Sequence, residues 1–182
     1  MINYARKTED GRLQTLQEHI INVSKYSARW GKSFYASELA RVAGAYHDLG
    51  KATKQFQKYL FKEKARHGSV PHSIYGAKKV YEDFCDHKPI AEILANVIAS
   101  HHGSLRDFLS PDGNTKLVAE LNQIVSNVNI IDQDDFNREK LDLEFKTILK
   151  SFPDKEFGVT MLIKLLFSCV VDADRFDAYL FE

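Results

Sequence analysis

The chain has 182 residues, of which 44% are hydrophobic and 27% are charged, values typical of one globular domain with its own core. Lys and Arg together number 25, as do Asp and Glu, so the chain is no bulk polycation and any nucleic-acid contact requires a local basic patch. The two cysteines are far apart and form no C-x-x-C pair, which argues against a disulfide framework and a structural zinc site.

The sequence shows neither a targeting signal nor a membrane-spanning segment. The first ten residues are polar and lack the apolar segment of a signal peptide. The longest apolar stretch, 159–171, contains Lys164 and is shorter than the roughly 20 residues that cross a bilayer. Both cysteines lie in apolar helical contexts, which indicates buried thiols in a reducing compartment. We therefore expect one cytoplasmic domain over residues 1–182, with no membrane association.

Apolar residues recur at spacings of three and four along most of the chain, which is the pattern of amphipathic helices. No stretch alternates apolar and polar residues as a strand would, so the predicted class is all-α, with about seven or eight helices. The last helix is apolar on nearly all sides at first and is expected to lie centrally in the core. Loops are expected at 62–71 and 103–114. The expected helices cover 13–30, 37–49, 51–62 (a helix or turn), 72–84, 89–100, 117–128, 141–152 and 157–179.

An imidazole and a carboxylate stand side by side at the end of a predicted helix, in the run His47-Asp48-Leu49-Gly50-Lys51. Neighbouring residues on a helix diverge by about 100°, so such a pair suits two ions with the carboxylate bridging them better than one symmetric chelate. Two ions about 3.5–4 Å apart stabilise both the attacking and the leaving oxygen in phosphoester hydrolysis. The run therefore predicts the centre of a metal site that acts on a phosphate ester.

Three further histidines stand where plain surface residues are not expected, although each has a structural alternative. His19 lies beside the apolar stripe of the first predicted helix, where a hydrogen-bonded core histidine is the commoner case. His101 and His102 precede a glycine at a predicted helix end, where they could serve as cations that oppose the helix dipole. These histidines are therefore candidate ligands only in combination with the other signals.

Two aspartates stand late in the last, strongly apolar helix. Burying Asp172 or Asp174 is costly unless the carboxylate is paired or bound to a metal. Arg175 is a candidate partner, so the pair has both a structural and a functional interpretation.

The order of these elements resembles the HD phosphohydrolase superfamily, and the resemblance extends from His19 to Asp177. The H-D-x-G-K block is diagnostic of the superfamily. The H-S-x-x-G-A block together with the H-H pair is most similar to the HD nuclease of type I CRISPR interference, the nuclease part of the CRISPR-associated helicase–nuclease. The elements in chain order are His19, His47-Asp48-Leu49-Gly50-Lys51, Pro71-His72-Ser73-Ile74-Tyr75-Gly76-Ala77, Ser100-His101-His102-Gly103 and Asp172-Ala173-Asp174-Arg175-Phe176-Asp177.

The resemblance implies an all-helical HD fold around a two-metal centre. It implies that one ion is bound by His19, His47, Asp48 and Asp174. The second ion is bound by Asp48, His72, His101 and His102. Asp48 bridges the two ions. A mixed His/Asp set fits Mn, Fe, Co or Ni, with Mg or Zn also acceptable.

The choice of Asp174 over Asp172 follows the superfamily, in which the carboxylate just before the basic or aromatic residue is the ligand. Asp172 and Asp177 then fall at other helix angles, where we expect them to pair with basic side chains. Lys51 is expected near the scissile phosphate, where it offsets negative charge. Asp48 and Lys51 are therefore the predicted catalytic residues.

The activity that the resemblance implies is metal-dependent cleavage of single-stranded DNA in antiviral defence. The chain contains no Walker-type motif, so the implied partners are a helicase, in cis or in trans, and a guide-RNA surveillance complex. The chain is thus expected to be a stand-alone subunit or an excised domain of a helicase–nuclease. Whether cleavage is endo or exo stays open.

A basic run follows the His-Asp pair, with Phe56, Tyr59 and Phe61 interleaved. Backbone-binding cations together with stacking aromatics suit a single strand, although a charge run is more often a solvated face. We predict substrate contacts by Lys51, Lys54, Lys58 and Ser73. The run consists of Lys51, Lys54, Lys58, Lys62, Lys64 and Arg66.

Two other functions are compatible with the sequence. One is a nucleotide or cyclic-nucleotide phosphohydrolase of the same superfamily, which would favour a closed pocket. The other is a non-catalytic helical scaffold with structural ions, although closed structural sites need no adjoining lysine.

Overall fold

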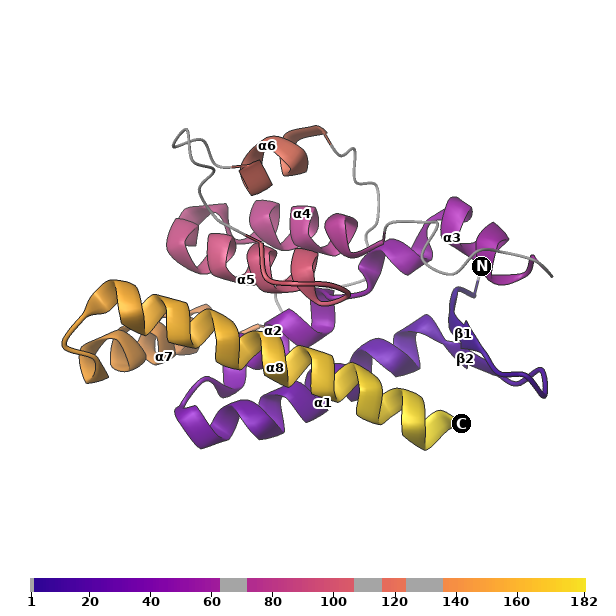
Figure 1. Cartoon of the computed structure of the whole chain (residues 1–182), viewed down its shortest axis with the longest axis horizontal. Helices are drawn as coiled ribbons and strands as arrows, with labels where there is room; N and C mark the ends of the chain where they lie inside the picture. Colours follow the sequence, from indigo (N-terminus) through magenta and orange to yellow (C-terminus); the bar gives the residue numbers. More distant parts are fainter. Residues whose placement is uncertain (1, 63–71, 107–115, 124–135) are drawn as a thin grey trace.

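The computed structural model describes residues 2–62, 72–106, 116–123 and 136–182. In this part of the chain a two-stranded hairpin precedes eight α-helices, between which three short 3-10 helices lie. The all-α prediction is confirmed (Figure 1). The elements are β1 (Tyr4–Lys7), β2 (Leu13–Thr15), α1 (Leu16–Gly31), η1 (Lys32–Phe34), α2 (Ser37–Tyr46), η2 (Leu49–Ala52), α3 (Lys54–Leu60), α4 (Ser73–Asp83), η3 (Cys85–His87), α5 (Lys88–Ser100), α6 (Lys116–Gln123), α7 (Arg138–Ser151) and α8 (Lys155–Phe181).

Side-chain caps fix where several helices begin. Thr15 accepts a hydrogen bond from the backbone N–H of Glu18 at the start of α1, and Asp154 caps α8 in the same way. At the start of α2 the carboxylate of Glu144, from α7, accepts hydrogen bonds from the N–H groups of Glu38 and Leu39. Each bond satisfies a backbone donor that has no partner within its own helix.

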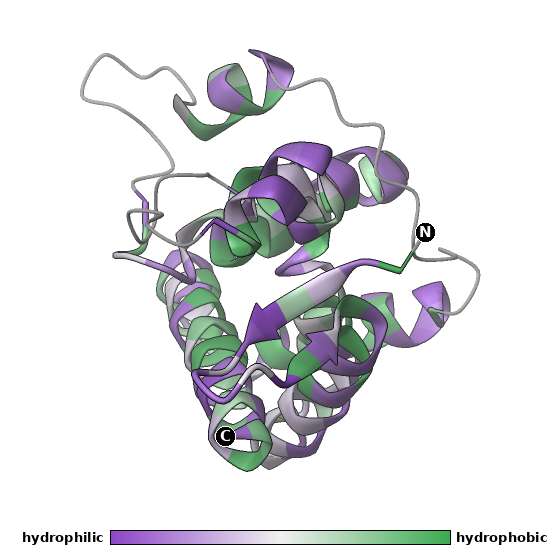
Figure 2. Ribbon diagram, turned by 90° about the vertical axis from the view of Figure 1, so that its right-hand side faces the viewer, coloured by the Kyte–Doolittle hydropathy of each residue, from purple (hydrophilic) through white to green (hydrophobic). Residues whose placement is uncertain are grey.

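The core is built around α2 and α5, whose residues are buried on nearly every side. Helix α8 crosses this pair and packs against α1, α2, α5 and α7 (Figure 1). Figure 2 shows hydrophobic residues gathered on the helix sides that face one another. The expectation that α8 lies centrally is wrong, because its buried residues form one stripe and Lys164 and Phe157 are exposed on other sides. Helix α8 therefore covers the core.

The N-terminal hairpin is the main departure from the predicted elements. Residues 13–15 form β2 and pair antiparallel with β1, so the first helix begins at Leu16 rather than at 13. Strands of four and three residues are too short to show a period-two pattern, which explains why none was expected. The end of the predicted helix over 117–128 and most of the two predicted loops lie outside the described residues. Within the described part, no helix combines the length and the apolar character needed to cross a membrane.

Candidate metal centre

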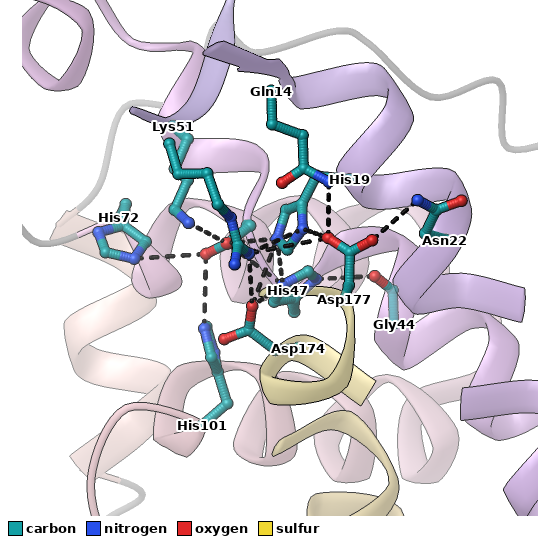
Figure 3. Close-up of polar contacts among 12 residues, drawn as sticks. Gln14, His19, Asn22, Gly44, His47, Lys51, His72, His101, Asp174 and Asp177 are labelled. Atoms are coloured by element: carbon teal, nitrogen blue, oxygen red, sulfur yellow. Dashed lines mark hydrogen bonds and ion pairs between the residues drawn. The ribbon is translucent and has the colours of Figure 1, made fainter. Parts of the chain in front are cut away.

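The predicted ligands come from five separate elements and meet at one place. Figure 3 shows His19, His47, His72, His101 and Asp174 pointing toward one another. His19 is on α1, and His47 and Asp48 directly follow α2. His72 immediately precedes α4, and His101 and His102 directly follow α5. Asp174 lies on α8. Five of these seven residues lie at helix ends, where side chains can approach a common point from several directions.

Two groups of ligand atoms result, and each fits within a sphere small enough for one ion. We call His19, His47, Asp48 and Asp174 the first group, and Asp48, His72, His101 and His102 the second group. Within each group the ligand atoms all lie within 4.8 Å of one another. Both groups contain Asp48, so a carboxylate placed to bridge two ions is present. The structure thus brings together all seven predicted ligands.

The first group is tightly packed around the Nε2 atoms of two histidines. These Nε2 atoms of His19 and His47 are 3.2 Å apart. Asp48 Oδ2 lies 3.1 Å from the first of them and 3.2 Å from the second. Asp174 Oδ1 lies 3.5 Å from His19 Nε2 and 4.0 Å from His47 Nε2. The side chains of His19, His47 and Asp48 are fully buried, and that of Asp174 is 19% exposed.

The second group surrounds the other oxygen of the shared carboxylate. Asp48 Oδ1 lies 3.3 Å from His72 Nε2, 3.5 Å from His101 Nε2 and 3.8 Å from His102 Nε2. The Nε2 atoms of His72 and His102 are 2.6 Å apart. His101 is buried, whereas the side chain of His102 is 45% exposed. This group therefore opens toward solvent.

Two buried atoms of the second group point to a cation. Asp48 Oδ1 and His101 Nε2 are both buried, and neither makes a hydrogen bond within the described residues. Unsatisfied buried acceptors are costly, and a metal ion coordinated by both atoms would remove that cost. Imidazole and carboxylate together suit divalent transition metals. The residues present therefore fit the two-ion centre expected from the sequence.

Hydrogen bonds at the far side of each ring turn a lone pair toward the centre. The Nδ1–H of His47 donates to the Gly44 carbonyl, and that of His101 donates to the Ile98 carbonyl. His19 Nδ1 lies 2.6 Å from Asp177 Oδ2. Because these oxygens accept, Nδ1 carries the proton and Nε2 is left to coordinate, as in most histidine-bound metal sites.

A family model described as HD domain matches residues 16–179. The chain belongs to the HD domain family. None of the curated proteins compared with the chain matches it. The family match makes this chain a metal-dependent phosphohydrolase, and its two groups are able to hold divalent ions. The match includes every candidate ligand and begins one residue after β2, so the hairpin lies outside it.

Two glycines of the HD domain motifs let its elements approach closely. A Cβ on Gly50 would lie 2.1 Å from the carbonyl oxygen of His72, and one on Gly76 would lie 1.9 Å from that of Tyr46. Side chains at these positions would push η2 away from His72 and α4 away from the end of α2. The glycines of H-D-x-G-K and H-S-x-x-G-A therefore hold His72 against Asp48.

The charge state of the centre follows from burial and its nearest cations. Burial alone would raise the pKa of Asp48, but the Lys51 ammonium and the neighbouring imidazoles hold it well below its usual range. Burial lowers the pKa of His101 to about 4, so this ring is neutral near neutral pH. Burial would also lower the pKa of His19, but hydrogen bonds with Asp177 and Asp48 outweigh it and raise this pKa. An ion in the first group must therefore compete with a proton.

Of the predicted substrate residues, Lys51 lies at the centre itself. Its Nζ is 2.5 Å from Asp48 Oδ2, and the residue is 8% exposed. Lys54 and Lys58 are exposed on α3, which follows η2 directly. The Ser73 hydroxyl donates to the Ala99 carbonyl. Among the aromatics, Phe56 is buried and cannot stack on a base, whereas Phe61 is 50% exposed.

Asp177 pairs with a basic residue as predicted, since Arg6 Nη2 lies 3.8 Å from its Oδ2, and it has a second role at the centre. Its Oδ2 accepts from His19 and from the Gln14 side chain, and its Oδ1 accepts from Asn22. Asp177 thereby orients a ligand of the first group. The signal was present, because positions 174 and 177 share a helix face. Asp172 is exposed, which fits the choice of Asp174.

Lys64, Arg66 and part of the expected loop lie outside the described residues. A further contribution to the centre was missed, namely Arg6 from β1, whose guanidinium is 3.2 Å from Asp174 Oδ1. No sequence motif marks this arginine, since its position depends on the hairpin.

Proposed function

We propose that this HD domain hydrolyses phosphodiester bonds of single-stranded DNA in the cytoplasm. The proposed setting is CRISPR type I interference, with a helicase that opens the duplex and a guide-RNA surveillance complex that selects it. The observation that carries the proposal is the pair of ligand groups that share Asp48, with Lys51 in contact with the shared carboxylate. The H-S-x-x-G-A block and the H-H pair, which are most similar to the CRISPR nuclease, support the substrate.

The protein's own residues have separate tasks in this reaction. Two divalent ions, when bound, supply an activated water and stabilise charge on the phosphoryl oxygens. Lys51 adds a fixed positive charge beside them, where developing negative charge is offset without reorganisation. Lys54 and Lys58 are exposed on the adjoining helix, and they would hold the backbone of the strand. A single strand can bring one phosphate to the exposed second group, whereas a stacked duplex cannot bend to do so.

The deciding experiment uses circular single-stranded DNA. The purified chain is loaded with Mn²⁺ and incubated with that circle, with a double-stranded circle, and with a panel of nucleotides and cyclic nucleotides. We expect nicking of the single-stranded circle, loss of nicking with a chelator, and poor cleavage of the duplex. Because a circle has no ends, nicking would also identify the enzyme as an endonuclease.

Asp48→Ala is the critical variant, since it removes a ligand from both groups. We expect it to lower the nicking rate at least about 10³-fold, because stabilisation of transition-state charge is lost. Asp86→Ala, at an exposed carboxylate that pairs with Arg138, is the matched control. Turnover of a nucleotide with the circle intact would instead identify a nucleotide or cyclic-nucleotide phosphohydrolase. Bound metal without any turnover would identify a structural centre.

A further inference from the structure

The N-terminal hairpin lies outside the matched HD segment, yet it delivers side chains to the metal centre. Arg6 Nη2, from β1, is 3.2 Å from Asp174 Oδ1 and 3.8 Å from Asp177 Oδ2. Gln14 Nε2, from β2, donates to Asp177 Oδ2 at 2.9 Å. The family match begins at residue 16. These contacts therefore come from outside the matched segment.

The hairpin is held in place at both of its ends. Gln57, on α3, accepts from the Tyr4 backbone N–H and donates to the Tyr4 carbonyl and to the Lys51 carbonyl. At the turn end of the hairpin, the Arg12 guanidinium donates to the carbonyls of Phe181 and Glu182 at the end of α8. Strand β1 is thus fixed to η2, and Arg6 has a defined position over the first group.

Arg6 contacts the same oxygen that the first group offers to an ion. Asp174 Oδ1 is the Asp174 oxygen that lies 3.5 Å from His19 Nε2, and Arg6 Nη2 lies 3.2 Å from it. In the same way, Lys51 Nζ contacts Asp48 Oδ2, the oxygen that Asp48 offers to the first group. Each carboxylate of the first group therefore has a protein cation on its ligand oxygen. A guanidinium and a divalent ion that share one oxygen repel each other, and they do so strongly where water is excluded.

The hydrogen bonding of Arg6 is incomplete. Its Nε is buried and has no partner within the described residues, although a guanidinium has five donors to satisfy. The side chain is 18% exposed. Its Nη2 lies 3.1 Å from His19 Nδ1, so the placement depends on this imidazole and on the charges of Asp174 and Asp177, and not on a complete set of hydrogen bonds. An ion that neutralises Asp174 would weaken that hold.

We propose that Arg6 is a positioning residue of the first group: it holds Asp174 and Asp177 in place and opposes ion binding there. Its charge lies beside both carboxylates and offsets the repulsion between them. The same charge makes the first group bind its ion less tightly than its four ligands alone would allow. The inference rests on the proposed ligand role of Asp174 and does not depend on the proposed substrate.

The test compares Arg6→Gln with Lys7→Gln, which removes the same charge from the neighbouring, exposed position of β1. Mn²⁺ affinity is measured by titration calorimetry, and Tm is measured with and without Mn²⁺. We expect Arg6→Gln to bind Mn²⁺ about tenfold more tightly, which corresponds to about 1.4 kcal/mol. Its ion-free Tm should fall by about 2–4 °C, and its gain in Tm on adding Mn²⁺ should exceed that of the wild type. Lys7→Gln should match the wild type in all three quantities.

A double-variant cycle assigns the effect to Asp174. In an Asp174→Asn background the carboxylate that Arg6 contacts is gone, so Arg6→Gln should no longer tighten Mn²⁺ binding. Unchanged or weaker binding by Arg6→Gln would overturn the inference, as would an equal effect of Lys7→Gln. A tightening that persists in the Asp174→Asn background would overturn it as well.

Failure of the inference can be distinguished from failure of the proposed function. Neither calorimetry nor melting uses DNA, so a chain that binds Mn²⁺ but cuts no strand still tests the role of Arg6. A wild-type chain that binds no Mn²⁺ would overturn both. If the protein is an active nuclease and Arg6→Gln does not change its Mn²⁺ affinity, only the inference is overturned.

Discussion

The two ligand groups share Asp48 but differ in how their other members are supported. In the first group, His19 is held by Asp177 and His47 by the Gly44 carbonyl, and both rings are fully buried. In the second group, the side chain of His102 is 45% exposed, and that of His72 is 14% exposed. The first group is therefore built into the core, whereas the second group, although its His101 is fully buried, opens to solvent at His102.

This difference assigns different tasks to the two halves. Ligands whose rings are fixed by hydrogen bonds hold an ion with fixed geometry, whereas the exposed imidazole of His102 leaves room for an exchangeable water or a phosphate oxygen. We expect the first group to anchor the centre and the second group to receive the substrate. The predictions below test this difference between the two groups, beginning with the largest expected effect.

The largest effect concerns the only first-group ligand that comes from α8. Asp174→Ala should remove the ion of the first group and lower the nicking rate about 10²–10³-fold, since one of two charges that stabilise the transition state is lost. Elemental analysis should then find one ion per chain where the wild type has two. Asp172→Ala is the matched control, because Asp172 is exposed two residues away. A larger loss in Asp172→Ala would show that the ligand was assigned to the wrong aspartate.

Much of this centre could be predicted because its signals are local. The H-D-x-G-K run, the His-Ser block and the His-His pair are each contiguous in the sequence, and helix ends bring them together. Asp174 was selected over Asp172 from the resemblance to the superfamily, whose ligand precedes the basic or aromatic residue, and the exposure of Asp172 agrees with that choice. The helical class also followed from local periodicity, which the core helices preserve.

The residues that were missed act through tertiary placement. Arg6 reaches the centre only because two very short strands pair and Gln57 fixes β1 to η2. Asp177 has the basic partner that was expected, Arg6, but its shorter contact is with the Nδ1–H of His19, from α1, and this contact was not expected. A partner that is distant in sequence cannot be read from the residues around either member.

The second prediction concerns the pH dependence of Mn²⁺ binding by the first group. Burial would lower the pKa of His19, but Asp177 and Asp48 outweigh it and raise the pKa above its usual 6.5. A protonated His19 cannot coordinate, so Mn²⁺ affinity of the first group should increase with pH until the pH exceeds this raised pKa. Below that point the affinity should fall about tenfold per pH unit, as for one competing proton.

Titration calorimetry at a series of pH values around neutrality measures this effect. Asp177→Asn provides the comparison, because it replaces the carboxylate whose hydrogen bond contributes most to raising the pKa of His19. The variant should show the same dependence displaced to lower pH. Histidines usually titrate at about pH 6 to 8. If the Mn²⁺ affinity of the first group does not change over this range, competition by a proton on His19 is contradicted.

The smallest effect concerns the exposed lysines of α3, which we expect to guide the strand to the second group. Lys54→Gln/Lys58→Gln removes two exposed charges from α3 and leaves Lys51 in contact with Asp48. Affinity for a short single strand, measured by fluorescence anisotropy with a chelator present, should fall a few-fold. The slope of log affinity against log salt should become shallower by about 1.4, since each lost contact with a single strand contributes about 0.7.

The matched control for this pair places the same loss of charge elsewhere on the surface. Lys25→Gln/Lys150→Gln removes two exposed lysines from α1 and α7, neither of which adjoins the second group. If the strand follows α3 into the open half, this control should keep the salt slope of the wild type. An equal change in both double variants would mean that the strand is attracted by the overall charge of the protein. The lysines of α3 would then give no evidence that the strand approaches the second group.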